Sequence, residues 1–194
     1  PIDRIISSAV LLLYAMPLFW LGLMFIVLFS VKLGVLPTGG LESIPAPLTI
    51  WGRVFDIVRH LTLPTLTLSL YYMAIYARVM RASMLEVYGQ DFIRTAKAKG
   101  LSDSKIAFKH VLRNALLPLV SMVGVQMGSL LGGSVIVETV FSWPGLGRAA
   151  FDAVFQRDFN LLMGILLLCS LLVIVANLIV DILYSVLDPR IERR

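Results

Sequence analysis

Four long stretches without a charged residue dominate the pattern of this chain. They cover residues 5–31, 60–77, 114–137 and 159–180, which are 27, 18, 24 and 22 residues long. A helix that crosses a membrane needs about 17–25 such residues, because the hydrocarbon core is about 30 Å thick and a helix rises about 1.5 Å per residue. The pattern predicts an all-α, polytopic membrane protein with four transmembrane helices. We find no internal repeat, and expect residues 1–194 to form one membrane domain.

Composition supports a membrane protein, and the basic residues indicate its orientation. Hydrophobic residues make up 58% of the chain, against about 45–50% in soluble domains. Eight of the 17 lysines and arginines lie between Arg78 and Arg113. With four spans, that loop shares its side of the membrane with both ends of the chain, and this side then holds 12 of the 17. The positive-inside rule places both ends and the middle loop in the cytoplasm.

Some positions within the predicted spans carry more specific expectations. Pro17 interrupts the first span and predicts a kink, which neighbouring helices can tolerate. Gly124, Gly128 and Gly132 share one face of the third span, so another helix can approach closely there, either within this chain or from a second subunit. Gln126 is a polar group in the same span, and such groups face other helices or a water-filled path.

The segment between the first two spans contains a possible amphipathic helix. Apolar residues stand at positions 51, 54, 55 and 58, which is the spacing of one helix face. Trp51 and Arg53 are suited to a membrane surface, which favours a helix at the outer interface. An ordinary short packing helix fits the same spacing equally well.

The middle loop, residues 83–118, has more encoded structure than a connector needs. Residues 84–99 are typical of a helix that Gly100 ends, and Ser102 is suited to begin the next one. Pro118 stands where that second helix meets the third span. A simple connector does not explain two caps and a sharp turn. A DNA-binding helix-turn-helix is disfavoured because spans tether both ends and no third helix supports a recognition helix. A docking element for a cytoplasmic subunit fits both observations.

This loop resembles the signature cytoplasmic loop of the permease subunits of ATP-binding-cassette importers. The general loop has Glu-Ala-Ala, three residues and Gly; here Arg94-Thr95-Ala96 precedes Gly100, as is common in the branch that imports peptides and nickel. Residues 17–22, 113–118, 141–147 and 187–191 also resemble that branch, although Glu192 replaces a more usual basic residue. Members of this family normally carry further spans upstream, so we expect this chain to be the C-terminal portion of a longer protein.

The resemblance implies an inner-membrane permease subunit that forms part of a pathway for peptides or a similar small solute. Its partners would be cytoplasmic ATPase subunits, a second, similar but non-identical permease, and an external solute-binding protein. The helix near residues 91–100 would couple to the ATPase, with small residues allowing close docking. The residues expected in that role are Asp91, Arg94, Thr95, Ala96, Ala98, Lys99 and Gly100. External segments 36–52 and 141–150, with Trp143, Pro144, Gly145 and Gly147, would contact the binding protein. Gln126 and Ser129 are the candidates for lining the pathway.

Several other functions find little support in the sequence. The chain has no Gly-x-x-x-x-Gly-Lys-Ser/Thr phosphate loop, so we do not expect it to hydrolyse ATP. Its two histidines lack an evident nucleophile or metal partner, and the single cysteine, Cys169, allows no disulfide within the chain. We therefore expect no enzyme activity, cofactor, metal or nucleic-acid partner. The alternative is a membrane-anchored regulator or scaffold that uses residues 91–113 on DNA or a protein.

Overall fold

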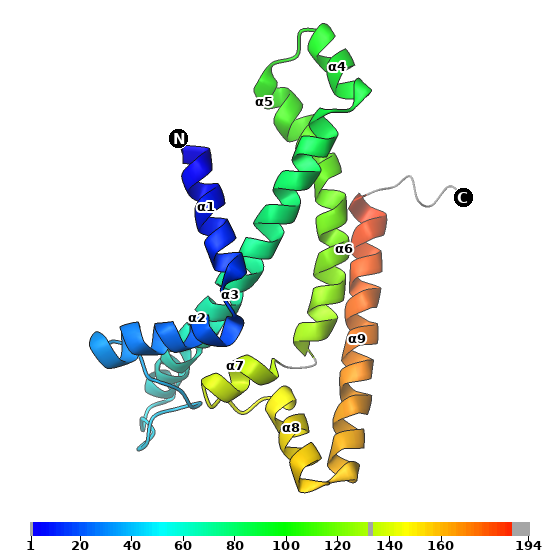
Figure 1. Cartoon of the computed structure of the whole chain (residues 1–194). Helices are drawn as coiled ribbons and strands as arrows, with labels where there is room; N and C mark the ends of the chain where they lie inside the picture. The colour runs from blue at the N-terminus through cyan, green and yellow to red at the C-terminus, as the bar shows by residue number, and fades with distance from the viewer. Residues whose placement is uncertain (1, 132–133, 188–194) are drawn as a thin grey trace.

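The computed structural model describes residues 2–131 and 134–187, and every regular element in these ranges is helical (Figure 1). This confirms the predicted all-α class. In chain order the helices are α1 (Ile2–Ala15), α2 (Leu18–Phe25), η1 (Ile26–Lys32), α3 (Ile50–Tyr88), α4 (Asp91–Ala98), α5 (Asp103–Lys105), η2 (Ile106–Val111), α6 (Leu112–Leu131), α7 (Val135–Val140), α8 (Leu146–Gln156) and α9 (Phe159–Leu187), where η marks π-helices. Gly132 and most of the 187–191 motif fall outside the described residues.

Two stretches of described helix are long and apolar enough to cross a membrane. They are Asp103–Gly124 and Phe159–Ile182. Two further helices, Asp3–Ala15 and Leu18–Lys32, are separated by a sharp bend and would add a third span if they are counted as one. The 39-residue α3 contains the second predicted span but is not among them, since threonines, a serine and three tyrosines interrupt its apolar residues. The count of four spans therefore stays a prediction.

The first apolar stretch turns a corner at Pro17 instead of kinking slightly. The helices on either side, Asp3–Ala15 and Leu18–Lys32, meet at 103°. Pro17 has extended backbone angles (φ −61°, ψ 139°), its ring nitrogen carries no hydrogen to donate, and proline disfavours helical geometry at the residue before it. As a result α2 runs across the foot of α3 while α1 stands beside α3 (Figure 1).

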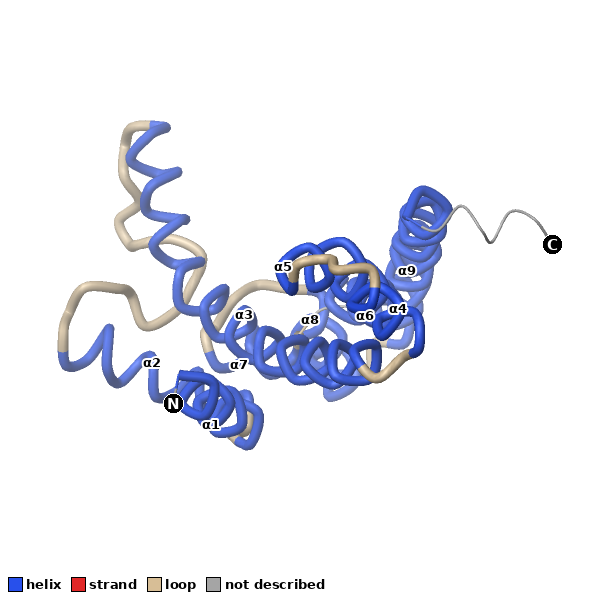
Figure 2. Tube along the Cα trace, turned by 90° about the horizontal axis from the view of Figure 1, so that it is seen from above, coloured by secondary structure: helices blue, strands red, loops and turns tan. Residues whose placement is uncertain are grey.

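Helices α3, α6 and α9 form the long axis of the molecule, with α6 packed against both neighbours. From above, α1 lies on the opposite side of α3 from α9 (Figure 2). The close approach expected at the glycine stripe is present at Gly124, where a Cβ atom would lie 2.8 Å from Val180 Cγ1 of α9. This contact lies within one chain.

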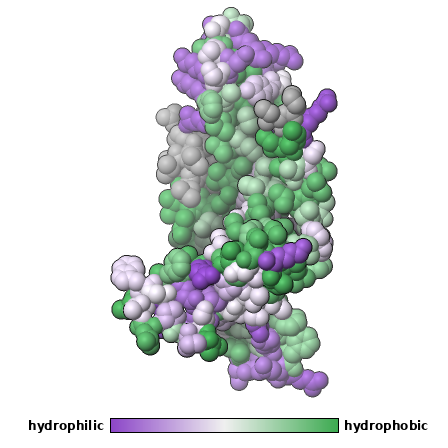
Figure 3. Space-filling view, turned by 90° about the vertical axis from the view of Figure 1, so that its left-hand side faces the viewer, coloured by the Kyte–Doolittle hydropathy of each residue, from purple (hydrophilic) through white to green (hydrophobic). Residues whose placement is uncertain are grey.

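Hydrophilic side chains gather at the two ends of the molecule. Figure 3 shows them at the tip that holds α4 and α5 and again at the opposite end, with apolar surface between. Exposed apolar side chains also lie on α9, where Leu167 and Ile174 have exposed fractions of 69% and 64%. Such exposure is expected where lipid or another subunit, and not water, surrounds the helix.

The Gly124 contact makes a prediction about packing. We expect Gly124→Ala to destabilise the protein by about 1–3 kcal/mol, because the added methyl group overlaps the stiff Val180 side chain. Gly164→Ala in α9 is the matched control, since no atom lies within 4 Å of the added Cβ and alanine favours a helix by up to about 1 kcal/mol. Thermal unfolding in detergent compares the two; equal midpoints would contradict close packing of α6 on α9.

Candidate functional site

The loop between α3 and α6 forms a small folded unit at the tip opposite α8 (Figure 1). The prediction of one helix over 84–99 is wrong: α3 ends at Tyr88, and Gln90 is extended (φ −78°, ψ 151°) before α4 begins at Asp91. Gly89, a weak helix former, stands at the break. The expected end at Gly100 is confirmed, because this residue has φ +74°, which glycine tolerates best.

The next helix begins where the sequence indicated. Ser102 is extended and precedes α5, although its hydroxyl does not cap the helix and instead lies 3.4 Å from Ser104 Oγ. Helix α5 continues through the π-helix η2 into α6. Pro118 lies inside α6 and not at a junction between two helices.

An apolar core holds α4 against the ends of α3 and α6. Ile93 and Ala96 are spaced three residues apart, so they share the inner face of α4 and are 1% and 6% exposed. The residues they pack among are Val87 of α3, Ile106 and Val111 of η2, and Ala115 of α6. The side chain of Ala96 therefore faces this core and not a partner, which differs from its expected part in close docking.

The outer face of α4 presents the remaining candidates to solvent. Asp91, Arg94, Thr95, Ala98, Lys99 and Gly100 are all exposed. Arg94 Nη1 lies 3.3 Å from Asp91 Oδ1, and Thr95 Oγ1 donates to the Asp91 carbonyl at 3.1 Å. Phe92, 40% exposed, shares this surface and was missed by sequence reasoning. Phe92 directly precedes Ile93 and therefore points to a different face of the helix, but the inward orientation of Ile93 is known only from the structure.

At the opposite end of the molecule, a buried carboxylate organises the turn that holds four candidates. Glu138 accepts hydrogen bonds from the backbone amides of Ser134 (3.0 Å) and Arg148 (2.7 Å). A Cβ atom on Gly145 would overlap this carboxyl group, and one on Gly147 would lie 2.8 Å from the Val135 nitrogen. Both glycines therefore make room inside the turn.

The other two candidates of this turn are more accessible. Pro144 is exposed and Trp143 is half-buried, whereas Gly147 is buried. Sequence reasoning missed Glu138, which binds the Ser134 amide four residues away and the Arg148 amide ten residues away along the chain.

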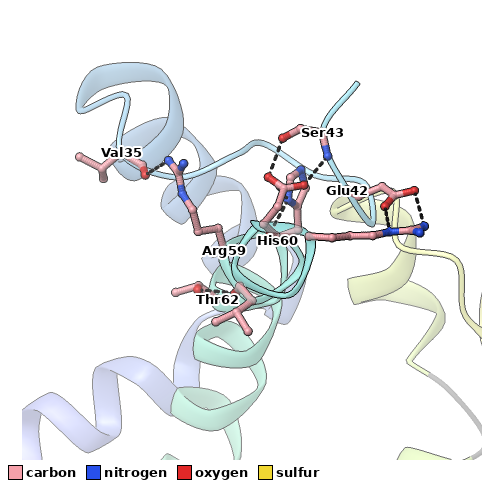
Figure 4. Close-up of polar contacts among 9 residues, drawn as sticks. Val35, Glu42, Ser43, Arg59, His60 and Thr62 are labelled. Carbon is pink, nitrogen blue, oxygen red and sulfur yellow. Dashed lines mark hydrogen bonds and ion pairs between the residues drawn. The ribbon is translucent and has the colours of Figure 1, made fainter. Parts of the chain in front are cut away.

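The loop before α3 is fastened to that helix by polar contacts (Figure 4). Asp56 accepts hydrogen bonds from the amide (2.6 Å) and hydroxyl (2.7 Å) of Ser43, and these bonds hold the pKa of its carboxyl group below the usual value. Arg53 forms a two-pronged pair with Glu42 at 2.7 and 3.1 Å. His60 Nδ1 lies 2.8 Å from the Asp56 carbonyl oxygen, so this helix turn also holds the ring.

The two segments that the sequence predicts to be external, 36–52 and 141–150, are joined to each other. The amide of Gly40 donates to the Phe141 carbonyl at 2.8 Å, and a Cβ atom on Gly39 would overlap that oxygen. The Phe141 ring is buried against Gly22 of α2 and packs with Leu63 of α3. The segments expected to contact a binding protein thus form one unit with α2, α3 and α7.

Between the long helices, Gln126 is a polar link. Its Nε2 donates to the hydroxyl of Tyr72 on α3 at 2.7 Å, and the Tyr72 ring lies 5.4 Å from that of Tyr71 and 6.5 Å from that of Tyr76. Ser129 lies in α6, but its side chain falls outside the described part of the structure. Among the described residues, no three His, Cys, Asp or Glu side chains are placed to hold a metal ion.

Comparisons with known proteins identify relatives across nearly all of this chain. The profile of the family described as binding-protein-dependent transport system inner membrane component matches residues 1–193. The chain is 48% identical over 178 residues to the oligopeptide transport system permease protein AppB of Bacillus subtilis (strain 168), covering 92% of this chain and 55% of that protein. It is 43% identical over 198 residues to the dipeptide transport system permease protein DppB of Escherichia coli (strain K12), covering 93% of this chain and 58% of that protein.

A third relative has a different named substrate. The chain is 44% identical over 190 residues to the glutathione transport system permease protein GsiC of Escherichia coli (strain K12), covering 98% of this chain and 58% of that protein. The chain therefore spans 55% to 58% of the length of these three relatives.

The core under α4 leads to a prediction about the loop. We expect Ile93→Ala to loosen α4, because it removes a nearly fully buried side chain at a cost of about 2–5 kcal/mol. Hydrogen–deuterium exchange should become faster in residues 91–100 while that of α9 stays unchanged. Phe92→Ala, at an exposed neighbouring position, should leave exchange unaltered. Equal protection in the Ile93→Ala protein would show that the core does not hold α4.

The Asp56 contact predicts a dependence on pH. The pKa of the Asp56 carboxyl group is lower in the folded than in the unfolded protein. Asp56 therefore stabilises the folded state fully at pH values above its unfolded pKa of about 4, and this stabilisation is lost as the pH falls through its folded pKa. The unfolding free energy of wild type should therefore exceed that of Asp56→Asn at pH 6, and the difference should shrink below pH 4. A difference that does not change with pH would contradict a charged Asp56 in this role.

Proposed function

Because this chain belongs to the binding-protein-dependent transport system inner membrane component family, we propose that it is a permease subunit of an ATP-binding-cassette importer. In that role it forms part of the pathway by which a solute crosses the inner membrane. The three relatives compared above are named for oligopeptide, dipeptide and glutathione transport. These solutes share peptide bonds, so short peptides are the proposed substrate class.

The observation that carries this proposal is the braced loop between α3 and α6. A loop that only connected two spans would need no core of its own, yet Ile93 and Ile106 are 1% and 0% exposed. Since α4 packs on residues from the ends of both long helices, a force on α4 reaches both of them. This is the property required of an element that transmits movement between an ATPase and the membrane.

The outer face of α4 is the proposed ATPase contact. Asp91, Arg94 and Lys99 supply charges that fix orientation, while Thr95, Ala98 and Gly100 add little bulk. Ala96 contributes from beneath by holding the helix in place. ATP shifts the equilibrium between inward-open and outward-open arrangements only if it binds the two states with different affinity. ATP hydrolysis itself belongs to the partner subunit.

We place the basic α4 tip in the cytoplasm, with both ends of this chain on the same side, because positive residues favour that side. The joined external segments, 36–52 and 141–150, then face the solute-binding protein, with Trp143 and Pro144 on the accessible surface and Gly145 and Gly147 shaping the turn beneath. A second, similar but non-identical permease completes the pathway, and Gln126 and Ser129 remain its proposed lining residues. The family match does not support the regulator or scaffold alternative.

The proposal predicts that Ala98→Trp uncouples transport. The indole would hold the ATPase surface away from α4 without touching the buried core, so ATP hydrolysis should continue while peptide uptake falls at least tenfold. Ala98→Ser is the matched control and should keep uptake within about twofold. Uptake and hydrolysis are measured with the full-length protein and its partners in proteoliposomes; normal uptake by Ala98→Trp would rule out α4 as the contact.

A crosslink locates the partner directly. In cells, full-length protein carrying Cys169→Ser and Ala98→Cys should crosslink to an ATPase subunit, in an amount that changes with ATP. If the new thiol reacts with a cytoplasmic reagent but captures no ATPase, the regulator alternative gains over the importer.

A further inference from the structure

One face of α3 carries a row of hydroxyl groups along much of its length. The row consists of residues spaced three or four apart, which share one side of a helix: Thr62, Thr65, Ser69, Tyr72 and Tyr76. A helix rises about 1.5 Å per residue, so this hydroxyl row is about 21 Å long, against about 30 Å for the hydrocarbon core of a membrane. It runs along α3 in the direction from segment 36–52 toward the α4 tip (Figure 1).

The hydroxyl row lies away from the face that α3 buries within the chain. Leu63, Thr67 and Ala74 belong to that buried face and are 1%, 0% and 0% exposed. In the row itself, Thr65 and Ser69 are exposed and the other three side chains are half-buried. The described part of the chain therefore leaves the row partly uncovered.

Hydrogen bonding indicates what meets this uncovered face. On α9, the exposed Ser170 donates to the Leu166 carbonyl at 2.7 Å, on a surface where Leu166 and Ile174 are 51% and 64% exposed. A hydroxyl on an apolar surface is thus satisfied by its own helix. Thr65 and Ser69 form no hydrogen bond with any residue that the structure describes. Since an unpaired hydroxyl is costly in hydrocarbon, these two belong on a face that meets water.

The remaining members of the row leave donors and acceptors available. Tyr72 accepts from Gln126 Nε2 of α6 at 2.7 Å, so its own hydrogen and the Gln126 carbonyl oxygen are left for other partners. Thr62 donates to the Val58 carbonyl at 2.8 Å, and its oxygen can still accept. Residues 60–77 include no Lys, Arg, Asp or Glu. An uncharged surface of donors and acceptors is complementary to peptide groups, which carry one of each.

We propose that the hydroxyl row and Gln126 form one wall of a water-filled pathway and hydrogen-bond the peptide groups of the passing solute. This inference rests on the proposed importer role and extends it by assigning the wall to α3. Water covers the row, and not lipid, because Thr65 and Ser69 have no partner among the described residues. The same arrangement explains why the 39-residue α3 is less apolar than a helix surrounded by lipid: one side of it faces the pathway.

The reactivity of an introduced thiol tests whether water reaches this wall. Ser69→Cys is placed in full-length protein that carries Cys169→Ser, assembled with its partner subunits in nanodiscs, and treated with a charged methanethiosulfonate reagent. A thiol reacts as its thiolate, which forms in water and not in hydrocarbon. Ser69→Cys should therefore react at least tenfold faster than Ser170→Cys, the matched control at an exposed serine of α9.

Contact with the solute is tested by uptake. Thr65→Val removes one hydroxyl at nearly constant volume and should lower uptake from a subsaturating mixture of di- and tripeptides about fivefold, the effect of one neutral hydrogen bond. Thr67→Val is the matched control on the buried face, where the Thr67 hydroxyl donates to the Leu63 carbonyl at 2.8 Å. It should keep uptake within about twofold of wild type.

Three results would overturn the proposed wall: equal reaction rates for Ser69→Cys and Ser170→Cys, capture of Ser69→Cys in a disulfide with another polypeptide in place of reaction, or unchanged uptake by Thr65→Val. If Ser69→Cys does not fold, Thr65→Cys gives the same comparison from the neighbouring turn. Wild-type uptake in proteoliposomes tests the importer role separately, so normal uptake together with an unreactive row would reject the wall alone.

Discussion

Backbone hydrogen bonding without water is the constraint on which the rest of this structure depends. In an apolar environment every amide needs a partner from the protein, which a helix supplies internally. The long helices α3, α6 and α9 meet this requirement along the axis of the molecule. At the end that holds α8 the chain leaves helical geometry, and buried side chains accept hydrogen bonds from backbone amides that no helix uses. Asp56 accepts from the Ser43 amide, and Glu138 accepts from the amides of Ser134 and Arg148.

The same constraint separates the two ends of the molecule by the way they are stabilised. The α4 tip is held by apolar packing around Ile93 and Ile106, and its charges are left on the surface. The opposite end is held by hydrogen bonds to the side chains of Asp56 and Glu138 and by close backbone contacts at glycines. The outer surface of α4 therefore presents its charges to solvent, with Arg94 lying 3.3 Å from Asp91, whereas segments 36–52 and 141–150 use their charges in contacts within the chain.

The sequence predicted those features that depend on neighbouring residues. The length of the apolar stretches predicted the helical class. Gly100 and Ser102 correctly marked the end of one helix and the start of the next, because the backbone conformations that a residue favours depend mainly on its own side chain and its sequence neighbours. It did not predict the 103° corner at Pro17, since a proline in a span is compatible with anything from a kink to a break until its neighbours are known. The inward position of Ala96 depends on the orientation that Ile93 imposes on α4, and the Arg148 amide that Glu138 binds lies ten residues away along the chain. Both depend on how the chain packs in three dimensions, which the local sequence pattern does not specify.

The joint between Gly40 and Phe141 links main chain to main chain. No side chain takes part in that hydrogen bond, so the way the two segments meet does not depend on which side chains this face presents. Residues such as Pro144, or the exposed Leu48, can be exchanged without disturbing how the two segments meet. In the proposed role of this end as a docking surface, the side chains that a partner would meet can therefore change while the backbone joint stays the same.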